Sequence, residues 1–328
     1  MADYDRIGRE EEWVPYLMRF CRPDCAFDSV STDSMGFRTS LDRERRPLTL
    51  GEPRAGGRPW SIVAGGSAVF GVGATSDAHT IPSILNRTTG RLWLNFGGRA
   101  FNSTQELILL LLHLPEALDR VVLVSGVNNI LLASLNDRAS PVYGTFFNQS
   151  VFERAMTGSS GDYVGVRRSA RQLLDEIRHR LAPHGPPDPT EHADGSSRGY
   201  HLLLDRFRLD LRAFKLLASG LGARLDFALQ PLANWIDKKL SPEEQELFGI
   251  LDKLQGDTWR VQSGSVRDAR DRYFADVAGV CEDEGIAFCN LNLDPTLADQ
   301  AWLFVDRVHL TDRGHALVAE IIVREFAL

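Results

Sequence analysis

The sequence predicts an α/β protein in which a parallel sheet of about five strands is covered by helices on both faces. Three observations support this prediction: short apolar runs, helical stretches between them, and glycine-containing turns where several of the runs end. Strands that alternate with helices in this way are typical of a parallel sheet buried on both sides. Of the 328 residues, 43% are hydrophobic and 25% are charged, which is ordinary for a soluble globular chain with a large core.

The predicted strands are 62–64, 92–96, 121–125, 225–229 and 286–289. The predicted helices are 77–87, 103–118, 165–182, 200–219, 241–255, 265–284 and 312–326. Residues 1–58 are expected to be an N-terminal extension that covers the core, with one amphipathic helix over 10–20 and irregular chain after it. Residues 59–328 form the main domain, with an insertion at about 136–222 that serves either as a lid over a site or as a surface excursion.

Composition excludes several functional classes. The net charge of −7 argues against a general surface for nucleic acid or for anionic membranes. The most apolar run, 107–112, is far shorter than the ~20 residues that span a bilayer, and residues 1–9 lack the apolar part of a signal peptide. The four cysteines are too few for a disulfide scaffold, so we expect them to be reduced and the protein to be cytoplasmic.

The stretch 60–76, WSIVAGGSAVFGVGATS, places Ser67 on a tight turn directly after a short apolar strand. The carboxyl edge of a parallel sheet is where open α/β folds bind ligands. Glycines at 65 and 66 allow a sharp turn and the close approach of a substrate. Ser67 therefore suits a nucleophile, although a serine here also suits the N-cap of the following helix.

Near the C-terminus the chain reads FVDRVHLTDRGHALVAEII, with Asp306 three residues before His309. An acid at this spacing can orient the imidazole, which can then accept a proton from a serine. Two other interpretations remain open: Asp306 as a cap with His309 as a surface residue, and a metal site that adds His315. The metal interpretation is the weaker one, because the sequence offers no further ligand cluster.

Two more strands end in turns that suit hydrogen-bond donors. VVLVSGVNN, at 121–129, places the amide of Asn128 at the same sheet edge, where it can donate to a developing oxyanion. LWLNFGGRAFNS, at 92–103, offers backbone N–H groups for the same purpose. Each stretch is also consistent with an ordinary turn between a strand and a helix.

Taken in their order along the chain, the four stretches resemble the SGNH hydrolase superfamily, also called GDSL-like esterases and lipases. Ser67 follows two glycines as in the first block, with Gly66 where the usual residue is Asp, and 126–129 resembles the third block, with Asn129 where Asp is common. The last block matches from Asp306 to His309 and continues through Leu310, Thr311 and Gly314. Aligning 95–97 with the second block puts Ala100 where the family has its oxyanion glycine. The resemblance covers 59–328 except the insertion.

The resemblance implies a three-layer α/β/α, flavodoxin-like fold and a serine esterase. Its substrate would be an O-acyl ester, such as acetyl or another short acyl group on a sugar or secondary metabolite. Ser67 would carry the acyl group, His309 would act as general base and then acid, and Asp306 would orient His309. The oxyanion donors would be the N–H of Ser67, the N–H of Ala100 or Gly98, and the side chain of Asn128. The resemblance requires no metal and no organic cofactor, and its partner is a small acyl ester rather than nucleic acid or membrane.

Three alternatives stand beside the esterase. The same acyl-serine can pass its acyl group to an alcohol or amine, and a non-catalytic ligand-binding protein can keep the fold. Nucleotide binding through 71–73 is the weakest alternative, since the stretch lacks the third glycine of a dinucleotide fingerprint and the lysine of a P-loop. Candidates for apolar contacts with the substrate, each equally at home in a core, are Phe101, Tyr143, Phe146, Phe147 and Trp302.

Overall fold

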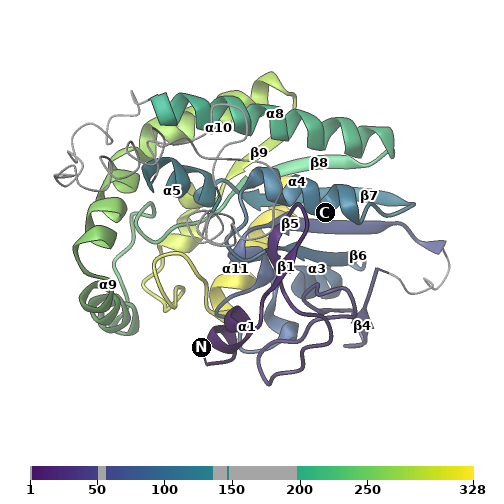
Figure 1. The fold of residues 1–328 in the computed structure, drawn as a ribbon, viewed down its shortest axis with the longest axis horizontal. Helices are drawn as coiled ribbons and strands as arrows, with labels where there is room; N and C mark the ends of the chain where they lie inside the picture. The colour runs from purple at the N-terminus through teal and green to yellow at the C-terminus, as the bar shows by residue number, and fades with distance from the viewer. Residues whose placement is uncertain (1, 51–56, 136–145, 148–197) are drawn as a thin grey trace, which may run out of the picture.

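Five parallel strands form the central sheet of the computed structural model, which describes residues 2–50, 57–135, 146–147 and 198–328 (Figure 1). Their order across the sheet is β6-β5-β7-β8-β9, so β5, which comes first of the five along the chain, lies between β6 and β7. This is the order of flavodoxin-like sheets, and it confirms the predicted fold class. The strands are β5 (Trp60–Gly65), β6 (Leu92–Gly97), β7 (Leu118–Ser125), β8 (Arg224–Leu229) and β9 (Ala287–Asn290).

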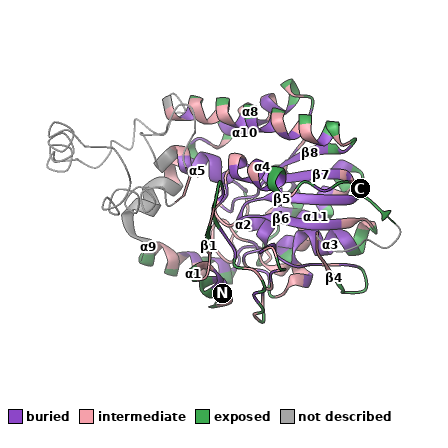
Figure 2. Cartoon of the chain, turned by 45° about the vertical axis from the view of Figure 1, so that its right-hand side comes forward, coloured by how far each residue is buried: buried purple, intermediate pink, exposed green. Residues whose placement is uncertain are grey.

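Helices cover both faces of the sheet, and the strand residues alternate between two cores. On β5, Ile62 and Ala64 pack with the helices of one face, while Val63 packs with the helices of the other. Figure 1 shows α8 and α10 together on one side, and Figure 2 shows the strands buried beneath helices whose outer faces are exposed. The first face carries α4 (Ser103–Leu112), α5 (Val127–Leu135), α8 (Arg198–Gly220) and α10 (Arg270–Asp283), and the second carries α3 (Ile81–Thr89) and α11 (Asp312–Phe326).

Several predicted boundaries are wrong, although the elements exist. The helix predicted over 103–118 ends at Leu112, because the chain must turn before β7 begins at Leu118. The two helices predicted over 241–255 and 265–284 are α9 (Pro242–Asp268) and α10, which leave only Ala269 between them. The helix predicted over 77–87 is a 3₁₀ turn, Asp77–His79, followed by α3. The helix predicted over 165–182 lies outside the described residues.

The helix predicted over 10–20 is wrong. The structure has α1 (Ala2–Arg9) and then an antiparallel hairpin of β1 (Glu12–Val14) and β2 (Met18–Phe20). Pro15 cannot supply a backbone donor inside a helix, and Tyr16 turns the chain with φ of +70°. A second small hairpin, β3 (Ser40–Leu41) with β4 (Pro47–Leu48), follows.

The N-terminal residues pack closely on the domain. Leu17, Phe20 and Phe37 are buried in the core beside α4, and Tyr4 is buried with Phe70 and other residues of the Ser67 region. This part of the chain therefore reaches the turn that carries the predicted nucleophile. Within the described part of the chain, no helix combines the length and the apolar composition needed to cross a membrane.

Candidate active site

Ser67 is the first residue of α2 (Ser67–Phe70), a single helical turn that starts directly after β5. Gly66 precedes it in an extended conformation and leaves no room for a side chain. A Cβ atom on Gly66 would lie 2.7 Å from Nδ2 of Asn128. Gly66 stands where the SGNH hydrolases usually have Asp. Because it has no side chain, the Asn128 amide can lie against the serine turn.

His309 and Asp306 meet Ser67 across the carboxyl edge of the sheet. Nε2 of His309 lies 2.8 Å from Oγ of Ser67, and Nδ1 lies 2.7 Å from Oδ2 of Asp306. The other carboxylate oxygen, Oδ1, accepts the backbone N–H groups of Val308 and His309, both at 2.8 Å. The structure thus brings together three side chains that are 242 residues apart at their widest, in the geometry of a nucleophile, a base and an orienting acid.

The electrostatics of this turn keep Asp306 ionised. Burial alone would raise the pKa of its carboxyl group, but the His309 ring and the two backbone N–H donors outweigh burial and lower that pKa below its ordinary value. A charged carboxylate at Nδ1 favours the tautomer in which Nε2 is free to accept a proton from Ser67. The local Asp-x-x-His turn therefore supplies both the orientation and the charge that a serine base needs.

Ser67, Ala100 and Asn128 line one cavity, and each carries a hydrogen-bond donor. Nδ2 of Asn128 donates one hydrogen to the carbonyl of Phe101 at 2.7 Å, which leaves its second hydrogen for a ligand. Ala100 lines the cavity with φ of +60°, a left-handed conformation that alanine adopts at a cost in free energy. Among the described residues no acceptor takes the N–H of Ala100 or of Ser67.

Gly98 is the other predicted donor of this loop, and the structure contradicts that prediction. Its N–H donates to the carbonyl of Gly65 at 3.0 Å, a bond that continues the pairing of β5 with β6. An N–H that is already bonded within the protein cannot stabilise an oxyanion without giving up that bond. Of the two predicted donors in this loop, Ala100 is therefore the one whose N–H is not bonded to another described residue.

A buried polar network supports the helix that carries Asn128. Asn129, the next residue, accepts the N–H of Ser103 at 3.3 Å and donates to Oγ of Ser103 at 2.8 Å. That hydroxyl donates to Asp210 of α8 at 2.7 Å, and Asp210 also accepts from Nε of Arg206 at 2.9 Å. The network ties α5 to α4 and α8, so the start of α5 is held in place.

A cavity of about 640 Å³ opens at Ser67 and His309 and is lined by both apolar and charged side chains. Its apolar residues include Val72, Phe101, Leu131, Phe147 and Val308. Its charged residues come largely from the N-terminal part of the chain and are Asp5, Arg9, Glu11, Arg19 and Arg99. Sequence analysis missed these charged residues, since no motif marks the four N-terminal ones and Arg99 is not one of the donors expected of the stretch 92–103.

The structure separates the five aromatic candidates. Phe101 and Phe147 line the cavity, whereas Phe146 and Trp302 are not among the described residues that do so. Trp302 is 43% exposed, and its Nε1 donates to the carbonyl of Phe304 at 2.8 Å, so its role as a substrate contact stays a prediction. Tyr143 lies outside the described residues.

Contacts within the protein account for His309 and Gly73, on which the metal and nucleotide interpretations depend. Both ring nitrogens of His309 are engaged by Ser67 and Asp306, while His315 is fully buried. Within the described ranges, no group of three or more His, Cys, Asp or Glu side chains gathers to hold a metal ion. At Gly73, φ is +97° and a Cβ atom would lie 2.2 Å from the carbonyl of Leu310, so a close backbone contact accounts for this glycine.

No family model matches the sequence, and no curated protein matches it. Several solved structures are similar at low identity. An extracellular lipase from Streptomyces rimosus is 15% identical, with a TM-score of 0.45 and coverage of 82% of this chain and 100% of that chain. Phospholipase A1 from Streptomyces albidoflavus NA297 is 11% identical, with a TM-score of 0.46 and coverage of 82% and 99%. An acetylxylan esterase from Geobacillus stearothermophilus is 14% identical, with a TM-score of 0.42 and coverage of 83% and 95%.

The molecule's own geometry is more informative than these similarities. Its strand order is flavodoxin-like, and the residues of the first, third and last sequence blocks meet at one edge of the sheet. In both respects the fold agrees with the resemblance to the SGNH hydrolase superfamily.

Proposed function

We propose that this chain is a serine esterase of the SGNH type that hydrolyses O-acyl esters through an acyl-enzyme on Ser67. The observation that carries the proposal is the chain of two short hydrogen bonds from Ser67 through His309 to Asp306, at 2.8 and 2.7 Å. An unassisted serine hydroxyl is a weak nucleophile, and an oriented imidazole base overcomes that weakness.

In the proposed reaction, Oγ of Ser67 attacks the acyl carbonyl while Nε2 of His309 takes the hydroxyl proton. The carbonyl oxygen becomes an oxyanion that accepts hydrogen bonds from the N–H groups of Ser67 and Ala100 and from Asn128. Collapse of this intermediate breaks the bond to the alcohol oxygen, which leaves with the proton held by His309. Water then attacks the acyl-serine with His309 again as base, and the free acid and the serine hydroxyl are restored.

The lining of the cavity suggests which parts of a substrate it would accept. Its apolar residues, with Phe101, Leu131 and Phe147, suit the acyl chain. Its charged residues suit an alcohol part that carries polar groups, because they present guanidinium and carboxylate groups to the cavity. From the resemblance we expect short acyl groups to be preferred over long acyl chains.

The test compares hydrolysis of p-nitrophenyl acetate, butyrate and octanoate by the wild type and by Ser67→Ala. A loss of about 10³-fold or more in kcat is expected, because the nucleophile is gone, and acetate or butyrate should exceed octanoate in kcat/KM. Ser219→Ala is the matched control, since Ser219 is an exposed residue on α8. Full activity in Ser67→Ala would contradict the proposal.

A fluorophosphonate probe distinguishes a narrow substrate range from a protein that only binds ligands. If no p-nitrophenyl ester is hydrolysed, covalent labelling of wild-type Ser67 still supports the esterase, because only an activated serine should react. Absence of both hydrolysis and labelling would favour the non-catalytic alternative.

A further inference from the structure

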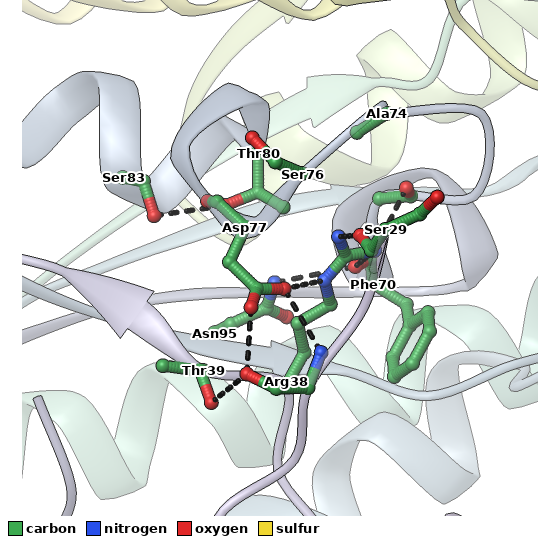
Figure 3. Close-up of polar contacts among 12 residues, drawn as sticks. Ser29, Arg38, Thr39, Phe70, Ala74, Ser76, Asp77, Thr80, Ser83 and Asn95 are labelled. Atoms are coloured by element: carbon green, nitrogen blue, oxygen red, sulfur yellow. Dashed lines mark hydrogen bonds and ion pairs between the residues drawn. The ribbon is translucent and has the colours of Figure 1, made fainter. Parts of the chain in front are cut away.

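Arg38 lies completely buried beneath the end of α2 and is bonded on every side (Figure 3). Its Nε donates to Asp77 at 2.8 Å, and its Nη1 donates to the carbonyls of Phe70 and Gly71 at 3.3 and 3.0 Å. These carbonyls close the helical turn that begins at Ser67, since Gly71 N–H donates to the Ser67 carbonyl at 3.0 Å. A cation at the C-terminal end of a helix is favourable, so Arg38 stabilises the serine turn from below.

Tyr4 joins the same cluster from α1. Its hydroxyl accepts from Nη1 of Arg38 at 2.8 Å and shares its single hydrogen between the carbonyls of Gly71 at 2.8 Å and Ala74 at 2.6 Å. The side chain is only 3% exposed, and burial raises the pKa of Tyr4, so the hydroxyl stays protonated as a donor. Tyr4 therefore holds the turn that carries Ser67.

The backbone of Tyr4 reaches the other half of the predicted oxyanion hole. Its carbonyl accepts from Nη1 of Arg99 at 3.0 Å, and Arg99 directly precedes Ala100. Arg99 also pairs with Glu11 at 3.4 Å, which itself pairs with Arg19 at 2.8 Å. One N-terminal residue thus contacts the loop of Ala100 through its backbone and the turn of Ser67 through its side chain.

We propose that Tyr4 is a positioning residue that sets the separation between the Ser67 N–H and the Ala100 N–H. This inference rests on the proposed esterase function. Two donors stabilise one oxyanion only when both lie about 3 Å from it, so a small relative shift weakens both bonds. The direct bond from Gly98 to Gly65 joins the two strands at their ends, and Tyr4 adds a second tie beyond that point.

The experiment uses the full chain with Tyr4→Phe, which keeps the ring and removes only the hydroxyl. We expect kcat for p-nitrophenyl acetate and the rate of fluorophosphonate labelling to fall about tenfold, with KM within about twofold, because the change acts on the transition state. Hydrogen exchange should become faster in 67–74, where the hydroxyl binds, with little change elsewhere, because the backbone carbonyl of residue 4 still accepts from Arg99. Tyr16→Phe is the matched control, since Tyr16 is 70% exposed.

Three results would overturn the inference. The first is a Tyr4→Phe enzyme whose kcat stays within about twofold of the wild type. The second is a loss of activity with faster exchange throughout the chain, which indicates a merely structural role. The third is unchanged exchange in 67–74, since the Tyr4 hydroxyl would then not hold the turn of Ser67.

Two further arms keep the test decisive. If Tyr4→Phe does not fold, Arg99→Gln replaces it, because that change breaks the tie to the Tyr4 carbonyl at a partly exposed side chain. Since Arg99 also lines the cavity, the measurement is hydrogen exchange: faster exchange in 98–101 at unchanged melting temperature supports the inference, and unchanged exchange there overturns it. If the wild type neither hydrolyses esters nor reacts with the probe, the proposed function has failed. The exchange pattern then decides the positioning role by itself: faster exchange in 67–74 with Tyr4→Phe and in 98–101 with Arg99→Gln supports it, and any other pattern overturns it.

Discussion

Residues 2–38 and residues 301–315 both hold the Ser67 turn, but they do so by different chemistry. The C-terminal stretch places one ring nitrogen, Nε2 of His309, 2.8 Å from Oγ of Ser67. The N-terminal stretch instead binds backbone carbonyls of the turn, through Arg38 and Tyr4. A reacting group therefore needs a particular side chain at a particular spacing, whereas a supporting group needs only a donor that reaches a carbonyl.

The strongest test of this comparison changes Asp306 to Asn. We expect kcat to fall about 10⁴-fold while folding stays intact, because an amide at Nδ1 favours the wrong tautomer of His309. Ester hydrolysis and thermal unfolding measure the two quantities. Asp299→Asn is the control, as Asp299 forms an exposed pair with Arg313 in the same part of the chain. If Tyr4→Phe lowered kcat as much as Asp306→Asn, the proposed distinction between the roles of residues 301–315 and residues 2–38 would be wrong.

A second test compares how much residues 2–38 and residues 301–315 contribute to the free energy of unfolding. Arg38→Met removes the fully buried partner of an ion pair and leaves several carbonyls without donors, so we expect a loss of about 3–5 kcal/mol in the free energy of unfolding. Arg307→Met at the C-terminal end breaks a partly exposed pair with Asp252, for which about 1 kcal/mol or less is expected. Urea unfolding of both variants measures the difference. Equal losses would contradict the view that the N-terminal end is the structural support.

The smallest expected effect is a difference in pH dependence. The pKa of Asp306 is lowered below its ordinary value of 3.8, so its stabilisation is present above that pH and is lost as the pH falls through the folded-state pKa. The pKa of Tyr4 is raised above its ordinary value of 10.0, so its stabilisation is present below that pH and is lost as the pH rises further.

Melting temperatures measured at acidic and at alkaline pH test these two losses of stabilisation. The difference between wild type and Asp306→Asn should shrink as the pH falls below about 4, and the difference between wild type and Tyr4→Phe should shrink as the pH rises above about 10. A Tyr4→Phe difference that stays constant up to about pH 11 would contradict the burial of a neutral hydroxyl in the N-terminal cluster.

The features of this protein that depend on neighbouring residues follow from the sequence alone. The five strands are predictable because buried parallel strands are short apolar runs, and α11 is predictable from its cap and its amphipathic period. The Asp306–His309 turn and the Ser67 turn are predictable because the residues of each act within one short stretch of chain.

Which distant groups meet depends on the tertiary structure. The N–H of Gly98 bonds to Gly65 where β5 and β6 end, and this leaves Ala100 as the proposed donor. Pro15 is unfavourable inside the helix predicted over 10–20, but only the tertiary structure shows that a hairpin takes its place and that its side chains help line the cavity. Arg38 and Tyr4 lie in stretches without any motif, and the carbonyls of the Ser67 turn that they bind are 32–70 residues away along the chain. Hydrogen bonds to backbone carbonyls do not depend on the side chain of the acceptor, so no local pattern could have revealed them.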